Sequence, residues 1–189
     1  LQPVVLQTGQ AAGALAALSA LGGREISEIS VRDVQNVLLE AGGYLLPYLD
    51  VPADHSWFRS LQRIGATGIM KSVGRNAGWS NQTHFRAYDT LLLSDLEGMR
   101  ELYNTGDIIF TGTSLTIGQT IDMILKIAGD NGTEITPSRI NELKDLVLKG
   151  EDDAALERLV TRGETAVIID ALLDPFNTHK VDIKGDFIK

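Results

Sequence analysis

The segment from Gln10 to Leu21 is the feature that most constrains how this chain can fold. It reads Gln-Ala-Ala-Gly-Ala-Leu-Ala-Ala-Leu-Ser-Ala-Leu, which combines high helix propensity with side chains that are small or apolar on every face. Leu15, Leu18 and Leu21 recur at helical spacing along one side. Such a helix needs apolar neighbours all round, so we expect either a core helix or a helix whose packing partner lies in another domain.

Two capping boxes in the last third of the chain predict repeated helical hairpins. Thr116 and Gln119, and again Thr161 and Glu164 about 45 residues later, place a hydroxyl and a long polar side chain three positions apart, just before an apolar run. In such a box the two side chains satisfy backbone amides at the helix start. Thr136-Pro137 is a further start signal, because proline is favoured at the first helical position.

The remaining signals also favour helices. Capping residues and apolar spacing predict helices over residues 30–41, 56–66 and 87–103, and a Gly-, Asn- and Ser-rich stretch predicts a loop over 73–83. A short strand is expected at 107–110 and an edge strand at 181–188. The predicted fold class is therefore mainly α, built of helical hairpin repeats with at most a few short strands. Buried stripes are expected at Val34, Val37 and Leu38 and at Trp57, Leu61 and Ile64.

Composition excludes several classes of function. A net charge of −8 and an isoelectric point near 4.8 argue against a phosphate-backbone binder, so no nucleic-acid partner is expected. No membrane insertion is expected either, because no apolar run approaches the roughly 20 residues that a spanning helix needs. The absence of cysteine removes disulfides and thiolate chemistry, and it leaves the compartment open.

No self-contained cofactor or metal site is evident in the sequence. Neither a Gly-x-Gly-x-x-Gly turn nor a Walker-type loop occurs, so nucleotide binding would need another domain. His55, His84 and His179 lack the paired spacing of metal-binding helices, and the acidic run 151–153 lacks the alternating ligands of a calcium loop. We therefore expect no metal site.

One cluster of residues supports an enzymatic alternative. Asn81, His84, Arg86 and Tyr88 lie close together, and β-elimination of uronates uses a similar quartet to neutralise a carboxylate and move a proton. Ordinary turn chemistry explains the same residues, so no catalytic residue is assigned. Trp79, beside this cluster, could instead stack on a sugar ring.

The first fifty residues resemble a known family of flavoproteins. Thr8-Gly9-Gln10-Ala11-Ala12-Gly13, with the later Tyr44-Leu-Leu-Pro-Tyr-Leu-Asp-Val51, is similar to the end of the flavin domain in Bacteroidetes-type FAD-dependent oxidoreductases, some of which are labelled xanthan lyases. The resemblance implies that Thr8, Gly9, Gln10, Ala11 and Ala12 contact FAD in the parent protein. The dinucleotide turn of that family is missing here, so no FAD is expected to bind this chain alone.

The middle and end of the chain resemble S-layer homology modules, which are helical and attach proteins to cell-wall polysaccharide. The similarity lies in Asp50-Val-Pro-Ala-Asp-His-Ser-Trp-Phe58, in Phe85-Arg86, and in the Thr-Arg-Gly-Glu sequence that begins at Thr161. The copies are degenerate and irregularly spaced.

Together these features predict three segments and an accessory role. Residues 1–46 are expected to end a flavin domain, residues 47–110 to form a module similar to S-layer homology, and residues 111–189 to form a second helical module with an edge strand. Because Leu1 is not Met and no charged leader follows, an upstream part is expected to have been removed. The resemblance implies an accessory domain of an exported, periplasmic or secreted, FAD-dependent oxidoreductase. Its expected partner is the flavin domain of the same polypeptide, with homodimer formation through the first helix, polysaccharide binding and xanthan lyase activity as alternatives.

Overall fold

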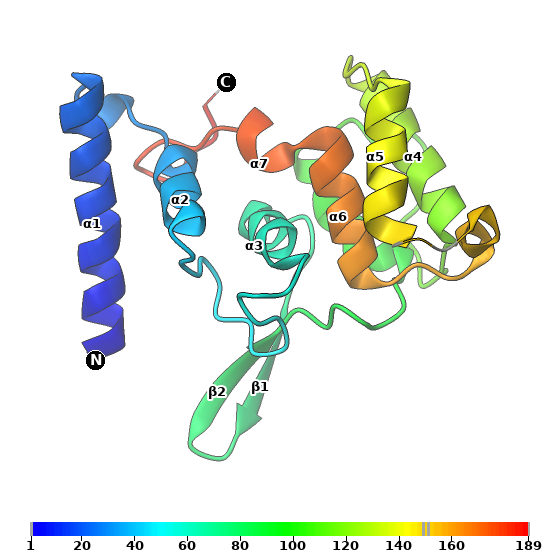
Figure 1. Cartoon of the computed structure of the whole chain (residues 1–189), viewed down its shortest axis with the longest axis horizontal. Helices are drawn as coiled ribbons and strands as arrows, with labels where there is room; N and C mark the ends of the chain where they lie inside the picture. The colour runs from blue at the N-terminus through cyan, green and yellow to red at the C-terminus, as the bar shows by residue number, and fades with distance from the viewer. Residues whose placement is uncertain (1, 149, 151, 189) are drawn as a thin grey trace. The chain divides into compact units, whose positions relative to one another are not determined.

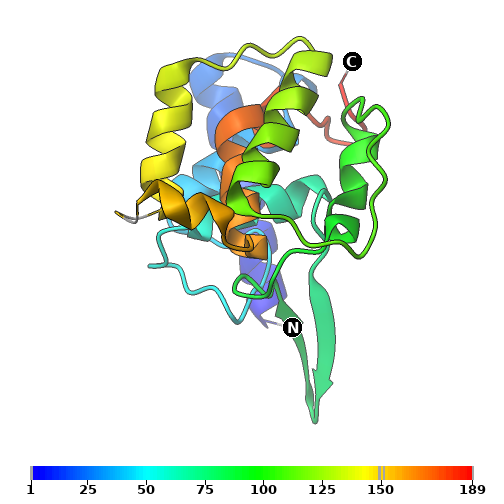
Figure 2. The ribbon, with the colours of Figure 1, turned by 90° about the vertical axis from the view of Figure 1, so that its right-hand side faces the viewer.

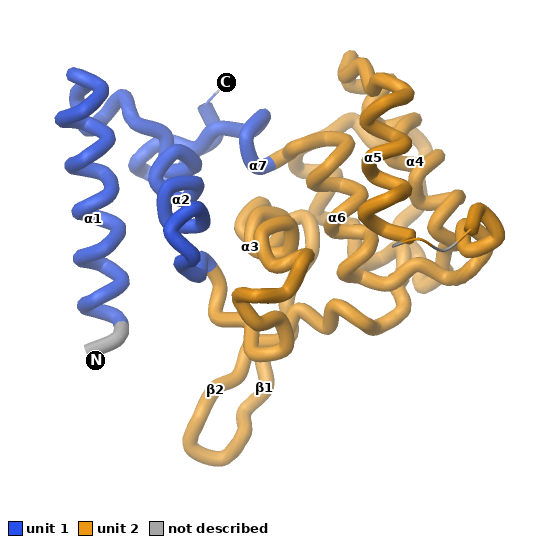
Figure 3. Tube along the Cα trace, in the orientation of Figure 1, with its two compact units in different colours: residues 1–45, 176–189 blue, residues 46–175 orange. Residues whose placement is uncertain are grey.

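A computed structural model describes residues 2–148, 150 and 152–188. Over these residues the chain is mainly α-helical with a two-stranded antiparallel sheet, which confirms the predicted fold class (Figure 1). It divides into two compact units, one formed by residues 1–45 with 176–189 and the other by residues 46–175 (Figure 3). The grouping differs from the predicted segments: residues 46–175 stay together, and the C-terminal residues belong with the first unit.

The first unit is built on two helices and a connecting turn. Helix α1 spans Gln2–Gly22, the 3-10 helix η1 spans Ile26–Glu28, and α2 spans Val31–Glu40. As expected, Ser30 caps α2, and its hydroxyl accepts a hydrogen bond from the Arg32 amide at 3.2 Å. The buried apolar residues of α2 are Val34 and Leu39, whereas Val37, expected inside, is 37% exposed.

The C-terminal residues close this unit against the start of α2. The Val31 amide donates to the Val181 carbonyl at 2.8 Å, and Lys180 pairs with Asp33 at 2.6 Å. Arg32 lies over the ring of Phe176, 4.7 Å from its centroid, so a buried cation has an aromatic face as a neighbour. The predicted edge strand at 181–188 is wrong: Val181 and Phe187 form an isolated bridge around a turn.

Helix α1 is longer and more exposed than the sequence predicted. It begins at Gln2 rather than near Gln10, and Val4, Val5 and Leu6 are 63%, 68% and 72% exposed. The stretch Val4–Gly22 is long and apolar enough to cross a membrane by length and composition, which corrects the statement that no apolar run approaches that length. The core helix of a globular protein can have the same length and apolar composition, but none of this stretch is buried here.

The second unit packs around one buried helix. Its elements are α3 (Phe58–Thr67), β1 (Val73–Ala77), β2 (Ser80–His84), the 3-10 helix η2 (Leu93–Glu101), α4 (Ile117–Asp130), α5 (Pro137–Leu148), the 3-10 helix η3 (Asp153–Glu157) and α6 (Arg162–Leu173). The short α7 (Pro175–Thr178) follows at the boundary between the units. α3, α4 and α5 all contact α6 (Figure 2). Every residue of α6 except Ala171 is buried. Trp57, Leu61 and Ile64 point into this core as predicted.

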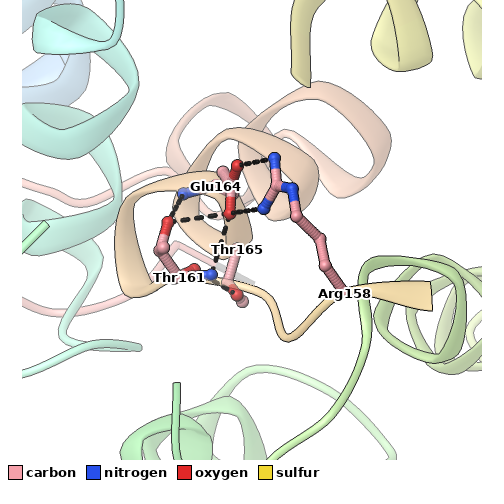
Figure 4. Close-up of polar contacts among 4 residues, drawn as sticks. All are labelled: Arg158, Thr161, Glu164 and Thr165. Carbon is pink, nitrogen blue, oxygen red and sulfur yellow. Dashed lines mark hydrogen bonds and ion pairs between the residues drawn. The ribbon is translucent and has the colours of Figure 1, made fainter. Parts of the chain in front are cut away.

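Both predicted capping boxes are confirmed. At α4 the Thr116 hydroxyl accepts from the Gln119 amide, and the Gln119 side chain accepts from the Thr116 amide. At α6 Thr161 and Glu164 make the same exchange, and Arg158 adds an ion pair to Glu164 at 2.6 Å (Figure 4). Hydrogen bonds from Arg158 and Thr161 hold the pKa of the Glu164 carboxyl below its ordinary value, despite burial. The start of α6 is thus fixed by local chemistry.

Other segments depart from prediction. Residues 73–83, expected as a loop, form the hairpin β1–β2, because Gly78 takes a positive φ of 62° and allows a two-residue turn. The helix expected over 87–103 is limited to η2, and residues 107–110 form no strand.

Arg162 links the start of α6 to three other segments. Its guanidinium donates to the carbonyls of Phe85 at 3.1 Å and Lys71 at 2.8 Å, and it pairs with Asp95 at 2.6 Å. The residue is 5% exposed. A charge this buried is tolerated because each of the three guanidinium nitrogens has an acceptor.

We expect Arg162→Met to lower the free energy of unfolding by about 3 kcal/mol, because the change leaves a carboxylate and two carbonyls without their donor. Urea unfolding followed by circular dichroism measures this. The matched control is Lys126→Met on the exposed side of α4, for which a change within about 0.5 kcal/mol is expected. A loss of less than 1 kcal/mol for Arg162→Met would contradict the role assigned to this residue.

A buried carboxylate joins α6 to α3. Asp170 is 8% exposed, and Arg63 of α3 contacts both Asp170, at 3.2 Å, and Asp174. Burial raises the pKa of Asp170 to about 6, against the opposing attraction of Arg63. The folded chain therefore binds a proton at a higher pH than the unfolded chain does.

The sign of the resulting pH dependence is the reverse of the usual carboxylate case. Asp170 contributes stability that grows as the pH falls through 6 and is lost as the pH rises. Between pH 7.5 and 5 we expect the unfolding free energy of the parent protein to rise by about 1 kcal/mol relative to Asp170→Asn. Urea titrations at the two pH values test this, with Asp122→Asn on exposed α4 as the control. Parallel pH profiles for the parent and Asp170→Asn would show that the carboxylate titrates normally.

Candidate functional site

An open cavity lined mainly by polar and charged residues lies at the base of the hairpin in the second unit. It has a volume of about 300 Å³ and is lined by basic, acidic and aromatic side chains together. Its lining residues are Asp50, Arg75, His84, Arg86, Ala87, Tyr88 and Asp89. Three members of the predicted quartet, His84, Arg86 and Tyr88, are among them.

The carboxylate of Asp50 fixes the turn that follows β2. Its two oxygens accept hydrogen bonds from the amides of Phe85, at 2.9 Å, and Arg86, at 2.6 Å. Phe85 is fully buried and packs edge-on against Tyr48. The turn is therefore anchored by a buried ring and by two charge-assisted hydrogen bonds.

Arg86 has a backbone conformation that is rare for a residue with a side chain. Its φ is 62°, in the left-handed region, which costs an ordinary residue about 1 kcal/mol or more. Two carbonyls that follow Arg86 are held by α6: that of Ala87 accepts from the Gly163 amide at 2.8 Å, and that of Asp89 accepts from the Arg162 amide at 2.9 Å. The first turn of α6 thus imposes the path of residues 86–89, and the side chain of Arg86 pairs with Asp89.

The register of the hairpin decides which side chains can act together. Arg75 pairs with Gln82 and Val73 with His84, so these four residues share one face. Asn81 pairs with Asn76 on the opposite face. The quartet considered for the lyase alternative is therefore not assembled, because Asn81 and His84 point to different sides of the hairpin.

A histidine behind the cavity fixes the hydroxyl of Tyr88. The Nδ1 atom of His55 accepts from the Trp57 amide at 3.0 Å, and its Nε2 atom lies 2.8 Å from the Tyr88 oxygen. This pattern assigns the proton of the neutral imidazole to Nε2, which then donates to Tyr88. The Tyr88 hydroxyl keeps its own proton for a ligand, and its side chain is 66% exposed.

Trp79 lies in the turn at the other end of the hairpin. Its side chain is 107% exposed relative to the reference state, so nothing among the described residues covers the ring. The hairpin projects away from the helices of its unit (Figures 1 and 2). An indole presented in this way offers a flat apolar face to a binding partner.

The residues predicted to contact FAD lie on α1 in the first unit. Thr8, Ala11 and Ala12 border an apolar groove of about 340 Å³, together with α2 residues and Ile183. Gly9 and Gln10 are exposed on α1, with open space around the position of a Gly9 side chain. The helix start lies at Gln2, six residues before Thr8, so these five residues sit within the helix rather than at its positive end.

These five residues suit only part of a flavin. Gly9 lies on the exposed side of α1 and Ala11 on the partly covered side, so a flavin ring can contact only one of the two. None is charged, and their backbone amides lie in the helix interior, so they offer no site for a pyrophosphate. A flavin held here would take its phosphate contacts from another domain, and the assignment stays a prediction.

No metal-binding group stands out in the described part of the chain. Residues 2–148, 150 and 152–188 contain no cluster of three or more histidine, aspartate or glutamate side chains placed to hold an ion. Of the acidic run 151–153, Asp152 caps η3 and Glu151 lies outside the described residues.

Comparisons with known proteins add no relative from which a function could be transferred. The chain matches no protein-family model, no curated protein and no solved structure.

Sequence reasoning selected only three of the seven residues that line the cavity. Asp50, Arg75 and Asp89 were not selected as candidates, because they come from separate stretches that only the hairpin and the α6 start bring together. The signal that could have found Arg75 was Gly78-Trp79 between two polar runs, since glycine at the first turn position is typical of a tight hairpin.

The hairpin register gives no support to the lyase alternative, because it separates Asn81 from His84. With Asn81 facing away from His84, we expect no unsaturated uronate when the purified chain is incubated with xanthan or polygalacturonate. Absorbance of the unsaturated product measures this. A product that disappears in both His84→Ala and Tyr88→Phe would establish the lyase activity instead.

Proposed function

We propose that this chain is an accessory helical domain of an exported FAD-dependent oxidoreductase, and that α1 packs against the flavin domain of the same polypeptide. The observation that supports this most is the uncovered apolar surface of α1, a helix of 21 residues without a charged side chain. Leaving a large apolar side chain in water forgoes about 1.5–3 kcal/mol. A helix with this many exposed apolar residues is therefore expected to have a partner.

The two sides of α1 differ in a way that fits this role. One side, with Ala11, Leu15 and Leu18, is partly covered within the first unit. The other side is exposed and consists of small residues at helical spacing, which allow a second backbone to approach closely. These residues are Gly9, Gly13, Ala16, Ala17 and Ala20. We expect the partner to lie on this outer side.

The resemblance to the flavoprotein family supplies the identity of that partner. In the family the corresponding helix belongs to the flavin domain, so the outer side of α1 would be interior in the complete protein. The redox chemistry would then belong to the other domain, and this chain would stabilise it. A second copy of the chain and a lipid bilayer are the two other partners that an apolar helix of this length could take.

We expect Ala16→Glu to be nearly neutral in the isolated chain and destabilising in a polypeptide that includes the flavin domain. In the 189-residue chain Ala16 is exposed and glutamate is a good helix former, so the melting temperature should change by no more than about 1–2 °C. In a polypeptide that includes the flavin domain, a carboxylate at a buried apolar contact should cost about 2 kcal/mol or more and reduce flavin retention. Thermal unfolding and flavin absorbance measure both, and the isolated chain should be colourless.

The control is Asn141→Glu, which adds the same charge at an exposed position of α5. It should be neutral in both contexts. If Ala16→Glu is neutral in the longer polypeptide as well, α1 does not pack against the flavin domain. Sedimentation that shows a dimer dissociated by Ala16→Glu would assign the surface to a second copy, and co-flotation of the chain with lipid vesicles would assign it to a membrane.

A further inference from the structure

Charge is distributed very unevenly along this chain. Between His55 and Tyr88 there are five basic side chains and no acidic one, although the whole chain has a net charge of −8. The five are Arg59, Arg63, Lys71, Arg75 and Arg86. This segment includes the hairpin and most of the cavity at its base. Arg63 is paired with Asp170 and Asp174, and the hairpin itself carries one basic residue, Arg75, and no acidic one, so it can attract an anionic group.

The free cationic group of the site is Arg75. Arg75 is exposed and has no ion pair among the described residues, whereas Arg86 forms an ion pair with Asp89. Arg75 shares a hairpin face with His84, and both line the cavity with Arg86 and Tyr88. The guanidinium groups suit a carboxylate, which they can bind through paired N–H donors, and the Tyr88 hydroxyl adds a neutral donor.

Two carboxylates in the same cavity narrow the choice of ligand. Asp50 and Asp89 would repel the closely spaced phosphates of a nucleic acid, but they can accept hydrogen bonds from hydroxyl groups. A ligand that combines a carboxylate with several hydroxyls satisfies both kinds of residue. The volume of about 300 Å³ is at the lower end of the range for small-molecule sites, which suits one sugar unit.

Trp79 extends this site beyond one sugar. From His84 at the hairpin base to Ser80 beside the turn, four strand residues cover about 13 Å at the usual rise per residue. A ligand that reaches both the cavity and the exposed indole must therefore be a chain of several sugars.

We propose that the hairpin β1–β2 and the cavity at its base bind a carboxylate-bearing polysaccharide, with one uronate unit in the cavity and a further sugar stacked on Trp79. No residue of this site belongs to α1, so the proposal is independent of the proposed packing of α1 against a flavin domain. It also differs from a site centred on the Thr-Arg-Gly-Glu sequence, because Arg162 is buried and its guanidinium is occupied by contacts within the fold.

The test compares galacturonate with galacturonate oligomers by isothermal titration calorimetry on the intact chain. Arg75→Gln should weaken both ligands about tenfold or more, because it removes a charged hydrogen bond to the bound carboxylate. Trp79→Ala should weaken the oligomer about tenfold and leave the monomer unchanged, since only the longer ligand reaches the turn. Rising salt should reduce the affinity of the parent but have less effect on Arg75→Gln.

Three controls keep this proposal falsifiable. Asn76→Ala changes the opposite face of the hairpin, and Lys126→Gln removes a positive charge from α4; neither should alter binding. Circular dichroism of each variant confirms that the fold is retained. Neutral malto-oligosaccharides should bind at least tenfold more weakly than the galacturonate oligomers.

Several results would overturn the proposal. Equal affinity for polyglutamate would show a general polyanion surface without recognition of sugars. Equal affinity for malto-oligosaccharides would show that the carboxylate is not recognised. Binding of the oligomer that survives both Arg75→Gln and Trp79→Ala would place any glycan site elsewhere on the chain.

Discussion

The buried guanidinium of Arg162 is the contact on which the second unit depends. It lies at the first position of α6 and bonds to a carbonyl after α3, a carbonyl after β2 and a carboxylate in η2. Removing a charge from water is costly unless each donor finds an acceptor, so these segments cannot move apart independently. The ring of Phe85 below the guanidinium, with its centroid 5.5 Å away, adds an aromatic contact to the same junction.

The contacts of Arg162 and Gly163 also fix one side of the cavity, formed by residues 86–89, whereas the hairpin forms the other side. The amides of Arg162 and Gly163 hold the carbonyls of residues 89 and 87, and a Cβ atom at Gly163 would lie 2.9 Å from the Ala87 oxygen and from the Trp57 ring. Only glycine permits that approach. The strained backbone of Arg86 is thus determined by its neighbours, as is common where a side chain must be held for binding. The hairpin forms the other side and extends outward, and at its base the Thr83 carbonyl accepts a hydrogen bond from the Leu49 amide at 3.0 Å.

The parts of the fold that sequence reasoning predicted are those set by local chemistry. The boxes at Thr116 and Thr161 and the cap at Ser30 each need only a few neighbouring residues, and all three were found where expected. The hairpin was missed because its strands are polar on both faces and show no apolar alternation. The helix predicted over 87–103 does not form over its first residues because of a tertiary contact. The carbonyls of residues 87 and 89 accept hydrogen bonds from amides of α6 and not from amides within a helix of their own.

The same contrast separates the motif that resembles a known family from the residues that can bind a ligand. In Thr-Arg-Gly-Glu, the threonine and glutamate close a capping box, the arginine joins three segments, and the glycine permits close packing. All four residues of this motif therefore make contacts that stabilise the fold. The groups that remain exposed, Arg75 and Trp79, lie on a hairpin that is outside the motif and is built from residues with little tertiary support. Changes on the hairpin can therefore alter binding at low cost to stability, whereas changes in the motif act first on the fold. Specificity in a chain of this kind should be sought on the hairpin.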